Sequence, residues 1–394
     1  MEKESRLNKI DGMRETFITN HHIISSLGFD SASNFNNLMY QKSGIKKHSR
    51  QNGESFYGTL IDKNRIDDQF SMLGNIDIYT SLEKMMLLSV YDILEKSKLK
   101  ISKKTGLIIS TTKGNIDVLS PQSKFYKDKK RVYLSVLGKQ IQIFFKFENE
   151  AILLSNACVS GVLAVSVADR LIKSKMYDDI IIVSGDLVTE FILSGFTSFH
   201  AISDAPCKPF SKNRSGINIG EAIASVLVSS TISNTSNETV QILGSGSCND
   251  ANHISGPSRT GEGLYLSVKS ALREAQISEK EINYISAHGT ATSFNDEMES
   301  VAFNRLNMLD IPLNSLKGYY GHTLGASGLL EIVIGIESLV HNTLLASEGF
   351  DELGVSYAIN IIEKTEKKKM NMFLKTASGF GGSNAAIILK KVEK

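Results

Sequence analysis

Short apolar segments alternate with segments of helical periodicity, and this alternation limits the fold more than any other feature of the sequence. Residues 105–110 (TGLIIS), 151–154 (AILL) and 179–185 (DIIIVSG) are almost continuous apolar runs of strand length. Strands have this composition when helices cover both faces of their sheet. Apolar residues at helical spacing predict helices over residues 79–94 and 159–170. The sequence therefore predicts a layered α/β fold.

The same alternation returns in the second half of the chain. It predicts helices over 261–274 and 329–339, and strands over 282–287, 355–362, 372–375 and 385–390. Small-residue turns at 156–161 and 321–328 each precede an apolar helix, and each carries one reactive residue, Cys158 and His322 respectively. We therefore predict two duplicated α/β halves, residues 1–235 and 236–394.

Charge and composition exclude several classes of protein. The net charge of +2 is too small to indicate nucleic-acid binding. The cysteines Cys158, Cys207 and Cys248 are odd in number and lack short paired spacings, which argues against a disulfide framework or a zinc finger. The start of the chain is polar, and no apolar run approaches the roughly 20 residues of a membrane span. We therefore expect a cytoplasmic protein without a signal peptide or membrane anchor.

Cys158 is the first candidate catalytic residue. The predicted strand 151–154 ends in a short turn and helical spacing begins at Val159, so Cys158 is expected in the first turn of a helix. Unpaired N–H groups and the helix dipole favour an anion there, which predicts a thiol of lowered pKa that is nucleophilic at neutral pH. The alternative interpretation is a small hydrophobic residue buried in the core.

Two histidines stand in glycine-containing turns that would expose a side chain to a pocket, His288 in SAHGTAT and His322 in YYGHTLGASG. Each alone is also compatible with a hydrogen-bonded structural histidine. Together with a helix-start cysteine they suit thioester chemistry, because a soft nucleophile can hold an acyl group while two imidazoles serve as hydrogen-bond donors or bases.

Four motifs in this order closely resemble the signatures of the β-ketoacyl-acyl carrier protein synthases. They are SNACVSG at 155–161, SAHGTAT at 286–292, KGYYGHTLGASG at 317–328 and SGFGGSNAA at 378–386. The resemblance implies a thiolase fold, with duplicated α/β halves in a five-layer αβαβα arrangement. It also implies an elongating, decarboxylating condensing enzyme, which extends an acyl chain by two carbons from malonyl-acyl carrier protein in fatty acid, polyene or type II polyketide synthesis.

The resemblance also implies roles for residues that match the motifs. Cys158 would be the nucleophile that takes the acyl chain from a phosphopantetheine thioester. His288 and His322 would hydrogen-bond the malonyl thioester carbonyl, help the carboxylate to leave as CO2 and stabilise the resulting enolate. Lys317 and Glu331 match a pair that braces the site, although sequence alone would place both in solvent.

Further matches concern the walls of the pocket. Phe380 matches an aromatic gate, and its backbone N–H, with that of the nucleophile, would form the oxyanion hole. Thr290 and Thr292 match residues that contact the pantetheine or malonyl end. Phe196 matches a residue that lines the acyl pocket, although core packing would explain it equally well. Ser378 stands where many relatives have a second phenylalanine, which predicts a looser gate or an unusual acyl chain.

The resemblance further implies partners. Acyl carrier protein would supply the phosphopantetheine, and neither a metal nor a tightly bound cofactor is expected. A homodimer, or a heterodimer with a related synthase subunit, is expected as well. Residues 124–131 (KFYKDKKR) form a basic cluster, which is either a solvated surface loop or a docking patch for an acidic partner.

Several rival functions stay open at this point. A cysteine peptidase would also pair a cysteine with a distant histidine, although this cysteine lies mid-chain in CVSG. A thiolase would have a further cysteine near the carboxyl end, and none follows Cys248. A chain-initiating synthase and a catalytically weak chain-length partner subunit are the closer alternatives. Acylation of Cys158 by a thioester would separate the active enzyme from such a partner subunit.

Overall fold

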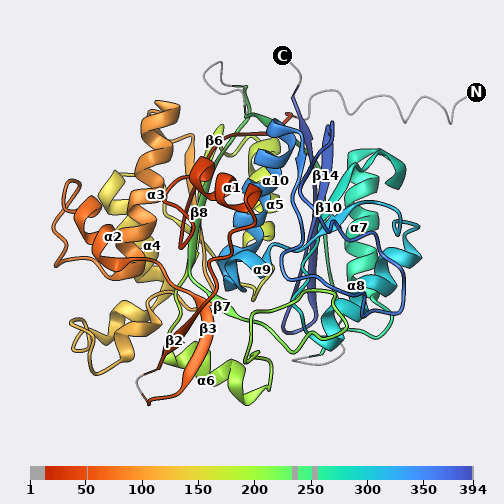
Figure 1. Cartoon of the computed structure of the whole chain (residues 1–394). Helices are drawn as coiled ribbons and strands as arrows, with labels where there is room; N and C mark the ends of the chain where they lie inside the picture. The colour runs from red at the N-terminus through yellow and green to blue at the C-terminus, as the bar shows by residue number, and fades with distance from the viewer. Residues whose placement is uncertain (1–13, 51, 233–237, 251–255, 393–394) are drawn as a thin grey trace, which may run out of the picture.

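The computed structural model describes residues 14–50, 52–232, 238–250 and 256–392. Within these residues, the main sheet contains ten strands, and helices lie between its two halves and outside each of them (Figure 1). The predicted boundary between residues 235 and 236 lies outside the described residues, as do residues 1–13 at the polar start of the chain.

The amino-terminal half contributes five strands, in the order β5 (Ile152–Leu154), β4 (Thr105–Ser110), β6 (Asp179–Asp186), β8 (Ala222–Ser229) and β1 (Phe17–Ser25). Strand β4 pairs in parallel with β5 and β6, whereas β8 is antiparallel to β6 and β1. All residues of β4 and β8 are buried. Their continuous apolar sequences therefore reflect a sheet covered on both faces.

The carboxyl-terminal half repeats this arrangement. Its strands follow the order β11 (Leu313–Asn314), β10 (Tyr284–Ser286), β14 (Met372–Gly379), β15 (Ser383–Lys391) and β9 (Val240–Asn249). Strand β10 is parallel to β11 and β14, and β15 is antiparallel to β14 and β9. The halves join where β1 pairs with β9. Strand order and direction match between the halves, so the predicted duplication of the fold is confirmed.

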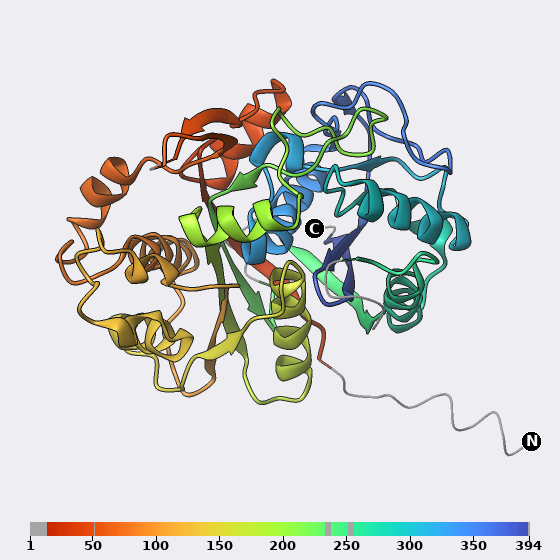
Figure 2. The ribbon, with the colours of Figure 1, turned by 90° about the horizontal axis from the view of Figure 1, so that it is seen from below.

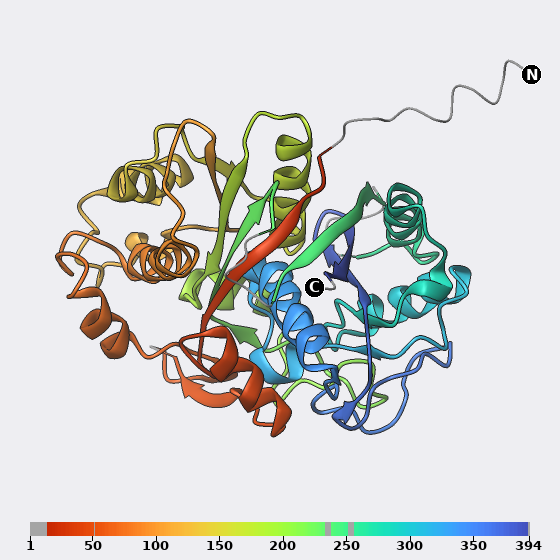
Figure 3. The same ribbon diagram turned by 90° about the horizontal axis from the view of Figure 1, so that it is seen from above.

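The helices form three layers around the two halves of the sheet. Helices α5 (Ser160–Lys173) and α10 (Ser327–His341) pack together between the halves. Helices α3 (Ser81–Ser97) and α4 (Leu134–Phe145) cover the outer face of one half. Helices α7 (Glu262–Ala275) and α8 (Ser293–Arg305) cover the outer face of the other. Figures 2 and 3 show this order from below and above, and it confirms the predicted five-layer αβαβα arrangement.

The remaining elements connect these layers or lie at their ends. They are α1 (Ser31–Met39), α2 (Lys63–Phe70), α6 (Glu190–Ser198), the short α9 (Lys317–Tyr320), a small sheet of β2 (Lys46–Ser49), β3 (Ser55–Thr59) and β7 (Ile219–Gly220), and the pair β12 (Thr343–Leu344) and β13 (Glu366–Lys367).

One strand prediction is wrong. Residues 355–362 form no named strand, and only an isolated bridge joins Ile361 to Leu313 of β11. Ile359 and Ile361 are nevertheless buried against the core of the carboxyl-terminal half. The apolar residues of this segment therefore reflect burial of an irregular chain, which has the same composition as a strand.

Helix α10 is unusually apolar for its length. The stretch Leu324–His341, which includes the turn before the helix, is long and apolar enough to cross a membrane, but 89% of it is buried inside the molecule. It lies between the two sheet halves and contacts β8 and β14 on opposite sides. Its composition is therefore that of a helix surrounded by core.

Candidate active site

Cys158 lies in the turn between β5 and α5. Helix α5 begins at Ser160, so Cys158 precedes the cap residue Val159 and does not lie in the first helical turn, where the sequence predicted it. The turn is sharp, because Ala157 has a φ of 44°, a conformation that non-glycine residues adopt only when surrounding structure enforces it. Ser160 enforces it by accepting a hydrogen bond from the Asn156 N–H and donating one to the Ala157 carbonyl.

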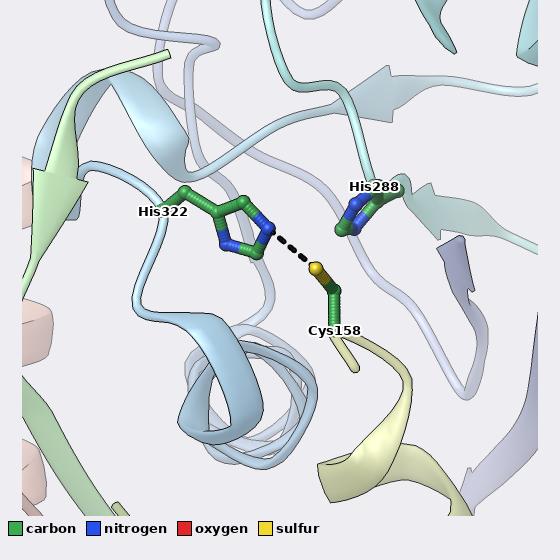
Figure 4. A group of neighbouring side chains, drawn as sticks. All are labelled: Cys158, His288 and His322. Carbon is green, nitrogen blue, oxygen red and sulfur yellow. Dashed lines mark hydrogen bonds between the residues drawn. The ribbon is translucent and has the colours of Figure 1, made fainter. Parts of the chain in front are cut away.

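His322 is in direct contact with the cysteine. It follows α9 in a buried turn, and its Nε2 lies 3.0 Å from Cys158 Sγ (Figure 4). The backbone N–H of Leu324 donates to Nδ1 of His322 at 3.2 Å, so Nδ1 acts as an acceptor. In the neutral imidazole the proton is therefore on Nε2, where it points toward the sulfur.

His288 reaches the same place from the end of β10. Its ring stands edge-on to that of His322, with 5.3 Å between centroids. Lys317 Nζ lies 3.4 Å from Nδ1 of His288. Because an ammonium can only donate, the neutral His288 ring also carries its proton on Nε2. Both imidazoles therefore offer an N–H donor.

The pKa values of both histidines are shifted in the direction that keeps the rings neutral. Burial, followed by the charge of Lys317, lowers the pKa of His322 to about 3. Burial and the same lysine hold the pKa of His288 well below its usual 6.5. At neutral pH both rings are therefore uncharged hydrogen-bond donors.

The predicted lowering of the Cys158 pKa is wrong. The residue is 7% exposed, and burial raises the pKa of its thiol to about 11, although Lys317 and a hydrogen bond from the Phe380 backbone act in the opposite direction. Desolvation of the thiolate therefore outweighs the favourable position near a helix start. The sulfur is a thiol at rest and becomes a thiolate only with the help of donors around it.

Lys317 and Glu331 lie behind the histidines, fully inside the protein. Lys317 Nζ is 2.9 Å from Glu331 Oε1 and donates to the carbonyl oxygen of His288 at 2.5 Å. Their relative exposures are 1% and 2%, so neither is solvated. The structure thus brings this pair to the site, as the family resemblance implied and the residue types alone did not.

Three further buried charged residues contact the site and were missed from the sequence. Glu299 of α8 accepts the N–H groups of His288 and Gly289. Asp186 of β6 accepts the N–H of Gly325 in the turn after His322. Lys375 of β14 lies beside Glu331. A sign of Lys375 was present in the sequence, because a lysine inside an otherwise apolar strand is unusual. No such sign marked Glu299 or Asp186.

A cavity of about 590 Å³ opens onto the three central side chains. All the other residues predicted to contact substrate line it, namely Phe196, Thr290, Thr292, Ser378 and Phe380. The hydroxyls of Thr290 and Thr292 lie 2.8 Å apart. Ser378 donates to the side-chain oxygen of Asn384 at 2.7 Å, so its own hydroxyl is engaged. The structure thus brings these five residues together around one cavity.

Aromatic rings form one wall of this cavity. Phe196 stacks on Phe380 with centroids 5.5 Å apart, and Phe199 meets the same ring edge-on at 5.5 Å. The backbone of Phe380 also faces the nucleophile, since its N–H hydrogen-bonds to Cys158. Gly379 allows this approach, because a Cβ there would lie 3.1 Å from the Cys158 backbone nitrogen.

Among the residues that the structure describes, two clusters have donor atoms close enough to hold a metal ion. The ligand atoms of Cys158, His288 and His322 lie within 4.8 Å of one another, and the same is true of a second cluster, His21, Glu238 and Glu337. In the first cluster, the adjacent Lys317 ammonium would repel a dication. The absence of a metal stays a prediction.

The basic cluster 124–131 is anchored inside the protein at its carboxyl end only. Arg131 is 9% exposed and pairs with the buried Glu83, while Lys124 pairs with Asp77. Lys129 lies over the ring of Tyr126. Arg131 therefore anchors the segment from inside, whereas its four lysines are exposed, and this arrangement is compatible with both a surface loop and a docking patch.

Comparisons with known proteins give a consistent result. The model of the β-ketoacyl synthase N-terminal domain matches residues 25–232, and that of the C-terminal domain matches residues 239–351. The 3-oxoacyl-acyl-carrier-protein synthase 2 of Coxiella burnetii is 26% identical, covering 96% of this chain and 99% of that protein. The tetracenomycin polyketide synthase ketoacyl synthase alpha subunit of Streptomyces glaucescens is 26% identical, covering 62% of this chain and 61% of that protein.

Solved structures resemble the chain over nearly its whole length. A ketosynthase from Xenorhabdus doucetiae, solved in complex with its chain length factor, is 25% identical with a TM-score of 0.84, covering 98% of this chain and all of that one. The ishigamide ketosynthase/chain length factor is 21% identical with a TM-score of 0.87, covering 97% and 100%. The fold of the chain is that of the ketosynthases.

Proposed function

The chain belongs to the β-ketoacyl synthase family, and we propose that it condenses an acyl group held on Cys158 with malonyl-acyl carrier protein. The observation that carries this assignment of residues is the contact of His322 Nε2 with Cys158 Sγ at 3.0 Å, with the His288 ring edge-on beside it. One sulfur and two neutral N–H donors share one cavity, and acyl transfer followed by enolate formation needs these groups.

The first step is transfer of the acyl chain to the enzyme. Cys158 Sγ attacks the carbonyl carbon of an acyl-phosphopantetheine thioester, a new C–S bond forms, and the pantetheine thiol leaves with the proton given up by the cysteine. The N–H donors of His322 and Phe380 stabilise the thiolate as it forms, which offsets the unfavourable pKa of the buried thiol. The backbone N–H groups of Cys158 and Phe380 then hold the tetrahedral oxyanion.

The second step is decarboxylative condensation. Malonyl-carrier protein loses CO2, and the enolate oxygen accepts hydrogen bonds from the Nε2–H groups of His288 and His322. The enolate carbon attacks the acyl-cysteine carbonyl, the C–S bond breaks, and the released Cys158 thiolate takes up a proton. Neutral imidazoles suit this step, because a charged ring would protonate the carbanion and end the reaction.

Two related assignments remain as alternatives. A chain-length partner subunit is suggested by the Xenorhabdus doucetiae structure, in which a ketosynthase is paired with its chain length factor. The presence of Cys158 between two histidine donors favours the active member of such a pair. A chain-initiating synthase would use the same cysteine, and the acyl chain found on it distinguishes that function.

Partners and location complete the proposal. Acyl carrier protein delivers both thioesters and supplies the phosphopantetheine, and the enzyme holds no cofactor of its own. Strand β5 is the outer strand of the amino-terminal half, and nearby Tyr133, which precedes α4, and Ile143 of α4 are 61% and 59% exposed. An unpaired strand edge beside exposed apolar side chains supports a dimer, with a second copy or a related subunit. The three free cysteines suit the reducing cytoplasm.

Intact-mass spectrometry tests the proposal. The wild-type protein is incubated with acyl-carrier proteins of several chain lengths and should gain one acyl mass, which Cys158→Ala should lose completely. His288→Ala and His322→Ala should retain acylation better than condensation, measured as CO2 release and β-ketoacyl product. The enzyme assignment is wrong if no chain length acylates the wild-type protein. The mass recovered on Cys158 also identifies the preferred chain and the pathway.

A further inference from the structure

Lys375 is a buried lysine that the proposed chemistry does not use. It lies in the middle of β14, is 0% exposed, and its ammonium is 2.5 Å from Glu331 Oε2. The same ammonium donates to the carbonyl oxygens of Ser286 at 3.1 Å and Ala287 at 3.0 Å. These are the two residues immediately before His288. A lysine is rarely buried without a specific partner, and this one has three.

Lys317 completes the arrangement from the other side. It is 2.9 Å from the second oxygen of Glu331 and donates to the His288 carbonyl at 2.5 Å. Two ammonium groups therefore flank one carboxylate and hold three successive carbonyl oxygens at the end of β10. Among the described residues, Glu331 Oε2 has no hydrogen-bond partner of good geometry. Its nearest cation is the Lys375 ammonium, with which it forms an ion pair.

We propose that Lys375 is a second positioning lysine, which with Lys317 clamps Glu331 and fixes the backbone that presents His288 to the cavity. This proposal rests on the proposed function, because it assigns Lys375 to the condensation step and not to acyl transfer. Lys375 is absent from the lining of the cavity, so it acts through the residues it holds and does not touch substrate.

The clamp also sets the charge around the two imidazoles. The titratable groups near them are His288 and His322 themselves, Cys158, Lys317, Lys375, Glu299 and Glu331. Lys375 contributes to lowering the pKa of both histidines, after burial and Lys317. Two lysine ammonium groups behind the imidazoles disfavour imidazolium, and they favour a carboxylate or enolate in front of the rings.

Substitution of Lys375 should therefore separate the two half-reactions. In Lys375→Met, acylation of Cys158 should stay close to wild type, whereas condensation should fall by about tenfold to a hundredfold, as expected for a misplaced catalytic group. The acidic limb of the condensation pH profile should move to higher pH by about half a unit or more, because removing a neighbouring cation raises a histidine pKa. Equal loss of both half-reactions, or an unshifted pH profile, would overturn the proposal.

Lys84→Met is the matched control. Lys84 of α3 is also buried, at 5% exposure, and also pairs with a carboxylate, that of Asp67, but it lies outside the cavity. Its loss should leave both half-reactions and the pH profile unchanged. If Lys375→Met does not fold, Lys375→Gln decides, because the amide can still donate to the carbonyls but lacks the charge, and the pH limb should shift in the same direction.

A readout that does not require activity separates this proposal from the enzyme assignment. Proton and carbon NMR titration of histidine-labelled protein, with His288→Asn and His322→Asn used to assign the two resonances, gives both pKa values directly. They should lie below 6.5 in wild type and rise in Lys375→Met. Failure of the wild type to acylate would refute the proposed function alone, whereas unchanged histidine titrations in the variant would refute the role of Lys375.

Discussion

Gly161 offers the sharpest test of how the fold positions the reactive atoms. It lies in the first turn of α5, three residues after Cys158, where α5 crosses α10. A Cβ at this position would be 2.6 Å from the backbone nitrogen of Leu329 and 3.1 Å from the Gly325 carbonyl oxygen. The crossing is tight from both sides, since a Cβ on Gly328 would lie 2.9 Å from the Val162 nitrogen.

The effect of Gly161→Ala can be worked from these distances. Ordinary contact begins near 3.4 Å, so the start of α5 must retreat from α10 by about 0.8 Å. The atoms in the way are backbone, which cannot rotate aside, and overpacking of this kind costs about 1–3 kcal/mol of unfolding free energy. The turns before these two helices carry Cys158 and His322, and a displacement approaching 1 Å lowers catalysis by up to about a hundredfold.

Two measurements and one control test this reasoning. Urea denaturation gives the loss of stability, and the condensation rate with malonyl-carrier protein gives the loss of alignment. Gly195→Ala in α6 is the matched control, because no atom lies within 4 Å of its Cβ. Alanine is the better helix former, so this variant should be as stable as wild type or more stable, by up to about 1 kcal/mol. A Gly161→Ala protein with wild-type stability and condensation rate would refute the argument.

Two further predictions concern the pocket and its pH dependence. Ser378→Phe should place a ring in the cavity wall and remove the hydrogen bond to Asn384, so acylation by long chains should fall by about tenfold relative to short chains, as judged by intact mass; equal losses would contradict this. Burial raises the pKa of Glu299 from 4.5 to about 7, so this carboxyl contributes stability below pH 4.5 that is lost as the pH rises through 7. Glu299→Gln should remove this pH-dependent loss of unfolding free energy. If the difference in unfolding free energy between the variant and wild type is constant between pH 5 and 8, the prediction is wrong.

Elements with regular apolar patterns could be predicted from the sequence. Strand β4 has the predicted bounds, and the duplicated turns before α5 and α10 carry Cys158 and His322 as expected. Helix α8 was missed, because its inner face mixes apolar side chains with buried carboxylates. Asp296 and Glu299 are buried there and accept the N–H groups of Phe210, Thr290, His288 and Gly289. A helix that buries carboxylates to hold a catalytic loop loses the periodicity by which helices are identified.

The electrostatics of the site could not be predicted from local sequence. A helix start argues for a reactive thiol, yet the pKa of Cys158 is raised, because residues distant in the chain exclude water from the sulfur. Lys317 and Lys375 come from α9 and β14, and nothing in either segment indicates that both meet Glu331 of α10. The balance of charges in a buried site depends on tertiary contacts. A sequence motif reveals these contacts only through a family whose site is already known.

The two equivalent halves of the fold contribute different residues to the site. Strands β6 and β14 occupy equivalent positions, and the carboxyl end of each lies beside the site. The chain that follows β14 supplies Phe380, which lines the cavity. The end of β6 supplies Asp186, whose carboxylate accepts hydrogen bonds from the hydroxyl of Thr111 and the N–H of Gly325. The amino-terminal half thus supplies Cys158 and holds the turn that carries His322, while the carboxyl-terminal half supplies both histidines and Phe380. Asp186 contacts the site through this turn. Replacing it by a residue whose side chain accepts no hydrogen bond should therefore displace His322, although Asp186 itself does not touch substrate.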